Sequence, residues 1–343
     1  MRARMIEVGI VGATGYAGQE LLKILHGHPY VRLTYLAASG RSDPQTVLRH
    51  FGRLPVPVGV FNPADCARSC RTVFLGLPHD ASMECVPALL RAGLRVLDLS
   101  AAFRLKDPRF YESHYKFRHN AVALLKTAVY GLPELYHEKL KGAKLVAVPG
   151  CYPTSAIIPL APVARKGWIR GKVIINTTSG ITGAGREAKP ELMYCEANEN
   201  ITPYGLFTHR HTPEIAQELA FAARGPVPVI FAPHYVPMNR GILTTTYLTL
   251  KAGVTRGMVL DALRKSYANA RFVRILDGYL PDTRSVRMTN FCDVGVAVDG
   301  RDAILVSAID NLVKGAAGEA VQAFNVSHGF PEDTALASPP GAP

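Results

Sequence analysis

The chain has 343 residues, of which 48% are hydrophobic and 19% charged, a composition typical of a globular protein long enough for two domains. It contains no apolar run of about eighteen residues and no signal-peptide layout at its start, so we expect no membrane partner and a cytoplasmic location. The net charge of +12 comes without a block of Lys and Arg or a basic stripe interleaved with aromatic residues, which argues against nucleic-acid binding and suits an enzyme with phosphate-bearing ligands.

The first feature along the chain is a glycine-rich turn between a strand and a helix. A β-rich run at 7–12 leads into glycines at positions 9, 12, 15 and 18, and residues 19–25 follow at helical spacing. Glycines in such a turn let backbone N–H groups approach a pyrophosphate at the helix N-terminus. The spacing departs from G-x-G-x-x-G, and a glycine-rich turn without a nucleotide is the alternative.

The end of the second predicted strand, at 31–38, favours NADP over NAD. An acidic residue at this point binds the ribose 2′-hydroxyl in NAD-dependent chains, and none is present here. Ser39, Arg41 and Ser42 follow instead and suit a 2′-phosphate. The alternative is that Arg41 is only a solvated loop charge.

Alternation of strands and helices continues through the first half of the chain. Strands at 72–77 and 95–99 flank a helical pattern at 81–90, which predicts an open parallel sheet with ligands at the carboxyl ends of its strands.

Two residues follow these strand ends. His79 either touches a cofactor or caps the next helix. Arg104 offers a bidentate contact to an oxyanion, or else pairs with the nearby Asp107.

Cys151 is the candidate nucleophile. It follows the apolar run 144–148, and residues from Thr154 onward predict the start of a helix. A thiol near a helix N-terminus lies in a positive field, which favours the nucleophilic thiolate. A buried structural cysteine is the alternative. The other cysteines, at positions 66, 70, 85, 195 and 292, are scattered, so neither a zinc site nor any other metal is expected, and free thiols in a reducing compartment are predicted.

Beyond Cys151 the pattern indicates a second kind of sheet. Long β-rich runs at 172–178, 228–233 and 241–250 predict a mostly antiparallel sheet with helices on one face. A helix at 256–265, a strand at 303–309 and a last helix at 311–322 follow.

Two further segments of this half bear on chemistry. The glycine-rich loop 179–186 follows a strand and lies against a nicotinamide or a phosphate, or is a plain connection. His209 and His211 precede a helix whose predicted cap is Thr212, with Pro213 in the first helical position. Either histidine suits a general acid/base or an exposed surface position.

These motifs together resemble the N-acetyl-γ-glutamyl-phosphate reductase family of arginine biosynthesis, which is related to aspartate-semialdehyde dehydrogenase. The resemblance covers nearly the whole chain. It rests on six segments, namely 9–18, 98–105, 130–135, 149–154, 209–215 and 308–315.

The resemblance implies a mechanism and a set of contacts. Cys151 attacks the acyl phosphate of N-acetyl-glutamyl phosphate to form a thioester, NADPH reduces it, and His211 serves as the acid/base. His209 is the alternative base, and the sequence leaves that choice open. The predicted cofactor contacts are Gly12, Thr14, Gly15, Tyr16, Ala17, Ser39, Arg41, Gly183 and Asn311. The predicted substrate contacts are Arg104, Ser179, Gly180, Arg186 and His209.

Two other functions are weighed against this one. A sister reductase of lysine biosynthesis acts on a carrier-bound acyl phosphate, but its members tend to have Asn-Ala after the cysteine, where this chain has Tyr152-Pro153. A non-catalytic NADP sensor would be expected to lose the nucleophile or the base, and both are present.

The predicted fold is α/β with two domains. Residues 1–150 with 311–331 form a Rossmann-type, doubly wound nucleotide-binding domain. Residues 151–310 form an α+β catalytic and dimerisation domain, and residues 332–343 form a flexible tail. The family implies a homodimer or homotetramer.

Overall fold

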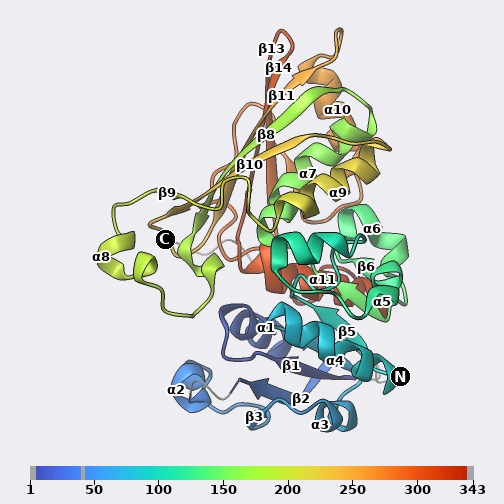
Figure 1. Cartoon of the computed structure of the whole chain (residues 1–343), viewed down its shortest axis with the longest axis vertical. Coiled ribbons are helices and arrows are strands. Elements are labelled where there is room, and N and C mark those ends of the chain that lie inside the picture. The colour runs from blue at the N-terminus through green and yellow to red at the C-terminus, as the bar shows by residue number, and fades with distance from the viewer. Residues whose placement is uncertain (1–4, 40–42, 338–343) are drawn as a thin grey trace. The chain divides into compact units, whose positions relative to one another are not determined.

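The computed structural model describes residues 5–39 and 43–337, which form two compact units (Figure 1). The first unit contains the chain up to Pro149 together with Ala316–Ala337, and the second contains Gly150–Gly315. Residues 311–315, which the sequence-based boundary assigns to the nucleotide-binding domain, therefore belong to the second unit. No helix in these described ranges is long and apolar enough to cross a membrane.

The first unit is built on a seven-stranded sheet with the order β3-β2-β1-β4-β5-β7-β6 and parallel pairing throughout. The chain winds outward from β1 in both directions, so the strand order reverses between β1 and β4. This confirms the doubly wound prediction and puts the reversal directly beside the glycine-rich turn. The strands are β1 (Ile6–Val11), β2 (Val31–Ala38), β3 (Val58–Val60), β4 (Thr72–Leu75), β5 (Arg95–Asp98), β6 (Val129–Tyr130) and β7 (Leu145–Ala147).

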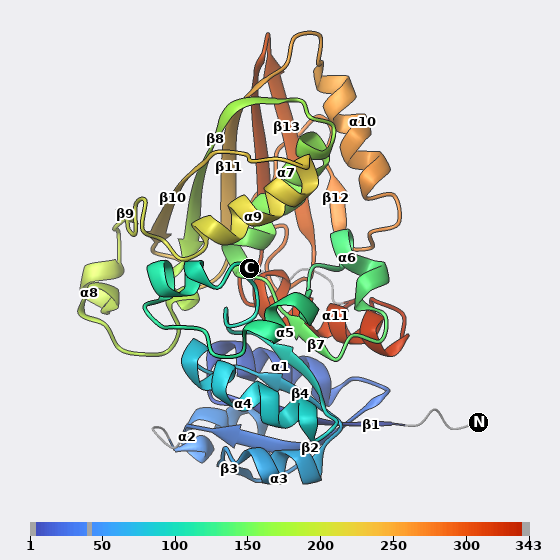
Figure 2. The ribbon, with the colours of Figure 1, turned by 45° about the vertical axis from the view of Figure 1, so that its right-hand side comes forward.

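Helices cover both faces of this sheet, with α1 and α11 on one side and α3 on the other (Figure 2). Strand β4 has buried residues throughout because both of its faces are covered by helices. Val73 and Leu75 join the core beneath α3 and α4, whereas the ring of Phe74 lies 5.7 Å from that of Phe324 in α11. A strand buried on both faces loses the alternation of polar and apolar residues. The helices of this unit are α1 (Tyr16–His26), α2 (Pro44–Leu48), η1 (Arg49–Phe51), α3 (Pro63–Ser69), α4 (His79–Arg91), η2 (Tyr111–Tyr115), α5 (Val122–Thr127), α6 (Pro133–Leu140) and α11 (Gly318–His328).

The C-terminal segment differs from the predicted flexible tail. Asn325 in α11 donates from Nδ2 to the carbonyls of Glu332 and Thr334, at 3.1 and 2.9 Å, and Leu336 is buried. Residues 332–337 therefore pack on α11, because a buried amide side chain supplies the bonds that their backbone requires. The remainder of the predicted tail, 338–343, lies outside the described residues.

The second unit contains a mixed sheet with the order β12-β13-β14-β11-β8-β10-β9. Four of its pairings are antiparallel and two, β8 with β10 and β12 with β13, are parallel. The sheet is thus mostly antiparallel, as the long β-rich runs predicted. Its strands are β8 (Ile169–Gly180), β9 (Thr202–Pro203), β10 (Val229–Val236), β11 (Ile242–Leu250), β12 (Val273–Ile275), β13 (Cys292–Asp299) and β14 (Asp302–Ile309).

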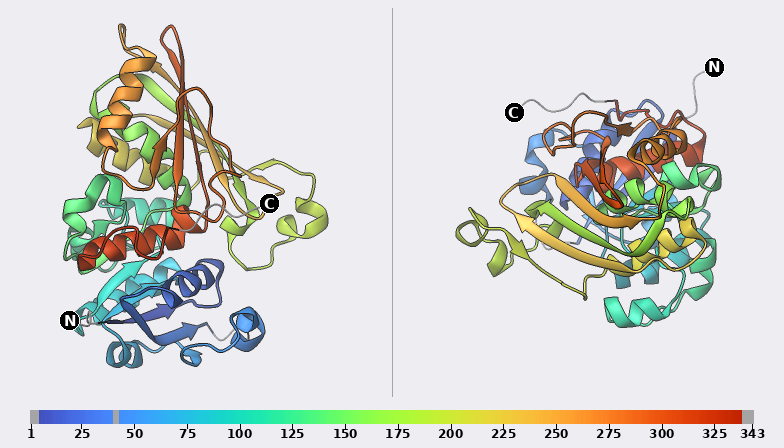
Figure 3. Two further views of the ribbon diagram at one scale, coloured as in Figure 1. Left: turned by 180° about the vertical axis from the view of Figure 1, so that it is seen from behind. Right: turned by 90° about the horizontal axis from the view of Figure 1, so that it is seen from above.

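The long helices of this unit gather on one side of the sheet (Figures 1 and 3). They are α7 (Cys151–Arg165), α9 (Thr212–Ala223) and α10 (Arg256–Ser266). Its short turns are η3 (Ile181–Ala184), η4 (Pro190–Leu192) and α8 (Tyr194–Ala197). The π-helical η5 (Val313–Ala317) contains the boundary between the two units, after Gly315. The predicted last helix at 311–322 is therefore a π turn followed by α11.

Helix α7 is the centre of the second unit, since every residue from Tyr152 to Ala164 is buried. Pro159 and Pro162 lie inside it and lack the N–H groups that would bond to the carbonyls of Ser155 and Ile158. Other elements supply those bonds. Ser307 Oγ donates to Ser155 O and Tyr267 Oη donates to Ile158 O, both at 2.6 Å.

Two predicted helix starts are displaced. Helix α7 begins at Cys151 with Gly150 as its N-cap, three residues before the predicted start at Thr154. Helix α9 has His211 as its N-cap, whereas Thr212 was predicted. Both errors have the same cause, because a proline is accommodated anywhere in the first helical turn, where no N–H is needed, and so does not mark one position.

The two bonds to the carbonyls of α7 predict a large effect from a small change. Tyr267→Phe keeps the ring but leaves the buried carbonyl of Ile158 without this donor, so the free energy of unfolding should fall by about 1–3 kcal/mol. Tyr279→Phe, at an exposed tyrosine of the same unit, is the matched control and should change it by less than about 0.5 kcal/mol. Urea denaturation followed by circular dichroism measures both. Equal effects would contradict the role given to Tyr267.

Candidate active site

Cys151 is the first residue of α7 and is half-buried. Gly150, the N-cap, has extended backbone angles of φ −73° and ψ 152°, so the chain enters the helix directly from the segment after β7. The dipole of a helix of 15 residues stabilises an anion at this end. Cys151 is therefore placed where a thiolate is favoured.

Tyr152 brings the two histidines of the 209–211 segment to the start of α7. Its ring centroid lies 5.6 Å from that of His209 and 5.8 Å from that of His211, both edge-on. Its hydroxyl is 2.8 Å from the hydroxyl of Tyr204 and also bonds Ser179 at the end of β8. The predicted residues 151, 179, 209 and 211 thus meet around a tyrosine that the sequence analysis did not single out.

The two histidines have different surroundings. His209 Nδ1 accepts the backbone N–H of His211 at 3.1 Å, and its ring packs among Tyr152, Tyr204 and Phe231. Burial, together with the charge of Arg210, lowers the pKa of His209 to about 4. His209 is therefore neutral at physiological pH. His211, the N-cap of α9, is 8% exposed.

Glu214 ties α9 to Gly150, the residue before Cys151. This fully buried carboxylate in the first turn of α9 accepts the backbone N–H of Gly150 through Oε1 at 3.0 Å. A glutamate three residues after an N-cap normally returns to its own helix end, and that pattern gives no hint of this contact. The bond holds the N-cap of α7 against the helix that carries His211.

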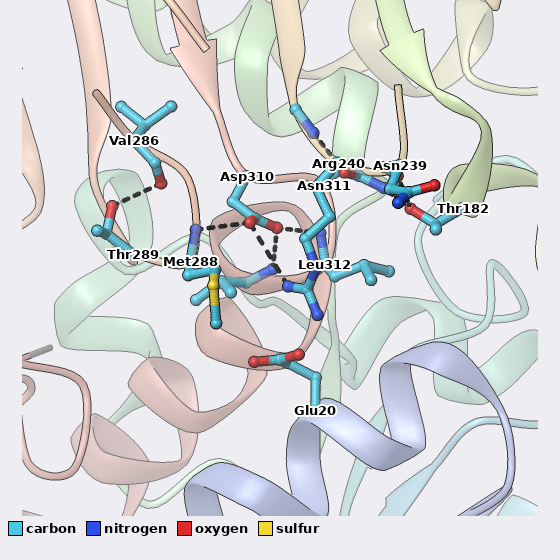
Figure 4. Close-up of polar contacts among 12 residues, drawn as sticks. Glu20, Thr182, Asn239, Arg240, Val286, Met288, Thr289, Asp310, Asn311 and Leu312 are labelled. Carbon is cyan, nitrogen blue, oxygen red and sulfur yellow. Dashed lines mark hydrogen bonds and ion pairs between the residues drawn. The ribbon is translucent and has the colours of Figure 1, made fainter. Parts of the chain in front are cut away.

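Asn311 and Asp310 bind the loop that follows β8 and the residues that precede β11 (Figure 4). Asn311 accepts the N–H of Gly241 through Oδ1 at 2.8 Å and donates from Nδ2 to Thr182 Oγ1 at 2.9 Å. The fully buried Asp310 accepts the N–H of Met288 at 2.7 Å and pairs with Arg240 at 3.5 Å. These bonds fix the glycine-rich loop after β8.

The remaining loop residues lie near these bonds. Gly183, in η3, is beside the amide of Asn311, Gly180 closes β8, and Arg186 follows η3 and is exposed. The loop therefore presents one cation next to an ordered turn.

The predicted cofactor loop belongs to the first unit, at the carboxyl end of β1. Gly12 has a φ of +86°, and a Cβ there would lie 2.4 Å from the carbonyl oxygen of Gly76, so only glycine permits this turn. Gly15 is the N-cap of α1, and Tyr16 and Ala17 begin the helix. A helix N-terminus at the reversal of strand order fits the pyrophosphate of a dinucleotide.

Of the other residues predicted to bind the cofactor in this region, the structure describes Thr14 and Ser39. Thr14 accepts a bond from Gln19 Nε2 at 3.0 Å through its carbonyl. Ser39 follows β2 and is exposed. Arg41 and Ser42 lie outside the described residues.

Arg104 and His79 both support the loop after β5. Arg104 is buried and donates from Nε to Val148 O at 2.7 Å and from Nη2 to Leu99 O at 2.8 Å, while Asp107 binds Arg109. A guanidinium carries further N–H groups, so the phosphate contact of Arg104 stays a prediction. His79 is the first residue of α4, whose N-cap is Pro78, and its Nδ1 accepts the N–H of Ala101 at 3.0 Å.

Family models match both units. Residues 7–143 match the model described as "Semialdehyde dehydrogenase, NAD binding domain", and residues 151–311 match "Semialdehyde dehydrogenase, dimerisation domain". Among solved structures, aspartate semialdehyde dehydrogenase II from Vibrio cholerae superposes with a TM-score of 0.72 at 19% identity, over 94% of this chain and 98% of that one. Aspartate semialdehyde dehydrogenase with NADP from Candida albicans gives a TM-score of 0.68 at 18% identity, over 94% of this chain and 98% of that one.

Curated relatives are much closer in sequence. The N-acetyl-gamma-glutamyl-phosphate reductase of Desulforamulus reducens is 46% identical over 97% of this chain and 98% of its own length. That of Geotalea daltonii is 45% identical over 97% of this chain and 99% of its own. The chain therefore belongs to the N-acetyl-gamma-glutamyl-phosphate reductase family, within the semialdehyde dehydrogenase fold.

Proposed function

We propose that this protein reduces N-acetyl-L-glutamyl 5-phosphate to N-acetyl-L-glutamate 5-semialdehyde and inorganic phosphate, in arginine biosynthesis. The observation that carries the proposal is the arrangement around Cys151, a cysteine at a helix N-terminus with two histidines beside the next residue. The reductases named for this substrate match nearly the whole chain at about 45% identity.

Cys151 does the covalent chemistry. Its thiolate attacks the carbonyl carbon of the acyl phosphate, a C–S bond forms, and the C–O bond to phosphate breaks with release of phosphate. A nicotinamide dinucleotide, when bound, supplies the hydride that reduces the resulting thioester. The hemithioacetal held on Cys151 then loses its C–S bond, which frees the semialdehyde and returns the thiolate.

His211 is the proposed general acid/base. It takes the proton of the Cys151 thiol before attack, donates it to the oxygen of the hemithioacetal as that intermediate forms, and accepts the hydroxyl proton again as the C–S bond breaks. His209 suits this task less well, because its pKa of about 4 leaves it neutral and its Nδ1 is engaged by the backbone of His211. We assign His209 to orienting His211 at the edge of the substrate pocket.

Substrate contacts are proposed for the loop after β8. Ser179 and Gly180 border the loop, and the exposed Arg186 offers a cation to the carboxylate or phosphate of the substrate. Arg104 remains a candidate for the phosphate.

The proposed cofactor is NADPH. Strand β2 ends at Ala38 without an acidic residue, and Ser39, Arg41 and Ser42 come next in the sequence. Serine hydroxyls and a guanidinium suit a 2′-phosphate, for which an acidic side chain would be repulsive. Gly12, Thr14, Gly15, Tyr16 and Ala17 would hold the pyrophosphate, and Gly183 and Asn311 would border the nicotinamide.

We further propose that two copies pair through the open face of the second unit's sheet. Ile174, Tyr247 and Ile304 are direct cross-strand neighbours on β8, β11 and β14, and are 41%, 43% and 37% exposed. Helices α7, α9 and α10 cover the opposite face. A second copy is the favoured occupant because these strands all lie in the segment whose family description is a dimerisation domain.

The reverse reaction tests substrate, cofactor and nucleophile in one assay. With N-acetyl-L-glutamate 5-semialdehyde, phosphate and NADP, reduced cofactor should accumulate at 340 nm (about the absorbance maximum of any reduced nicotinamide), and NAD should serve markedly less well. Cys151→Ser should abolish turnover yet bind NADP within a few-fold of the parent, because a serine hydroxyl is far harder to ionise. Turnover only with a carrier-bound substrate would sink the proposed substrate, and equal use of NAD would sink NADPH.

The pH profile of turnover distinguishes the proposed roles of His211 and His209. His211→Asn should lower kcat by about 10²–10⁴-fold and remove the limb of the pH profile that this residue gives. His209→Asn keeps an acceptor for the N–H of His211 and should act mainly on KM, with that limb retained, since a group with a pKa of about 4 does not titrate near neutrality. If the His209 variant loses more kcat than the His211 variant, their roles must be exchanged.

A single charge on the open sheet face tests the pairing of copies. Tyr247→Asp should shift the protein to a smaller species in sedimentation velocity, because a carboxylate cannot be desolvated in that interface without a partner. Met258→Asp, which adds the same charge at an exposed position of α10, should leave the assembly unchanged. An unaltered sedimentation coefficient for Tyr247→Asp would exclude this face.

A further inference from the structure

The chain returns from β14 through a π-helical turn, η5, whose geometry is unusual. The N–H of Gly315 donates to the carbonyl of Asp310, five residues earlier, at 2.9 Å, which widens the turn beyond an α-helix. The carboxylate of Asp310 accepts the N–H groups of Leu312 and Val313 at 2.8 and 3.1 Å, so the first residues of the turn are held in place (Figure 4). π turns are rare and occur frequently at functional sites.

This wide turn brings the backbone of Gly315 into contact with the nucleophile. A Cβ built on Gly315 would lie 2.7 Å from Cβ and 3.2 Å from Cα of Cys151, and 3.3 Å from Cδ1 of Ile309. Two carbon atoms do not approach to 2.7 Å, so any side chain at position 315 must displace Cys151 or the turn. Gly315 does not have a left-handed φ. Position 315 therefore requires glycine because a side chain would have no room there, and not because of its backbone conformation.

The contact matters because of where Cys151 stands in its helix. A side chain inside a helix is restricted at χ1 by the preceding turn, but Cys151 is the first residue of α7 and has no preceding turn. The wall formed by Gly315 replaces that restriction. The backbone of Gly315 blocks one side of the Cys151 Cβ, so the χ1 rotamers that remain open point Sγ away from η5.

We propose that Gly315 is a positioning residue for the reaction, which sets the location and rotamer of the Cys151 thiolate by backbone contact. The inference rests on the proposed role of Cys151 as nucleophile. A thiolate displaced by a few tenths of an ångström attacks a carbonyl poorly, since covalent catalysis depends on near-attack geometry.

Gly315→Ala tests this proposal in the full-length protein. We expect kcat to fall by about 10–100-fold, with KM for the semialdehyde and for NADP within about threefold. We also expect a changed rate and pH profile for alkylation of Cys151 by iodoacetamide. Peptide mass spectrometry must assign the label, because Cys195 is also exposed. This second readout needs no substrate, so it holds even if the proposed substrate is wrong.

Two further variants distinguish positioning from general damage. Gly257→Ala is the matched control, because this glycine of α10 has only Thr255 Oγ1, at 3.9 Å, near the added methyl group, and it should leave kcat and alkylation unchanged. Ile309→Val added to Gly315→Ala removes Cδ1 of residue 309, which would lie 3.3 Å from the methyl group added at position 315. The pair should recover kcat several-fold, whereas Ile309→Val alone should have little effect.

Parent-like kcat and alkylation in Gly315→Ala would overturn the proposal. A fall in kcat with no recovery in the double variant would overturn it as well, because it would show damage unrelated to the crowding at Cys151. If Gly315→Ala does not fold, the variant that combines it with Ile309→Val is compared with Ile309→Val alone. The proposal then requires that the rate or pH profile of Cys151 alkylation differ between these two proteins.

Discussion

The second unit depends on hydrogen bonds from other elements to the carbonyl groups that the prolines of helix α7 leave unbonded. Helix α7 contains two internal prolines, yet it is buried along almost its whole length, where an unpaired carbonyl is costly. Ser307 from β14 and Tyr267 from the end of α10 donate the missing bonds. The sheet and α10 are thereby attached to α7 at fixed positions, and the helix N-terminus that carries Cys151 has little freedom to move.

The chemistry is built outward from that end of α7. The carboxylate of Glu214 holds the N–H of Gly150, and Tyr152 packs against both histidines. Glu214 lies in the first turn of α9, and His211 is the N-cap of the same helix. One buried hydrogen bond and one aromatic contact fix the positions of Cys151 and His211, the proposed nucleophile and acid/base, relative to each other. A preorganised site needs support of this kind.

The first unit depends on a different constraint. Its parallel strands are apolar on both faces, so helices must cover both, and the chain must reverse its direction of winding beside β1. Gly12 lets the backbone pass close to Gly76 at that reversal, and α1 begins three residues later at the N-cap Gly15. A glycine turn that leads directly into a helix N-terminus is therefore a consequence of how this sheet is wound.

The sequence by itself determined the features that depend on near neighbours. The period of apolar residues specified most strands and helices, the glycines at 12 and 15 specified the turn after β1, and the apolar run before Cys151 specified a thiol at a helix start. The helices α7 and α9 begin at Cys151 and Thr212, three residues and one residue before their predicted starts, because proline fits every position of a first turn.

Only the tertiary structure decided which distant groups meet. Glu214 reaches Gly150 across 64 residues, and Asn311 joins Gly241 to Thr182. Gly315, which looks like an ordinary helix residue in sequence, touches Cys151. No local pattern encodes these contacts, because hydrogen-bonding capacity belongs to a residue, whereas the identity of its partner follows from how helices and sheets pack once the chain is folded.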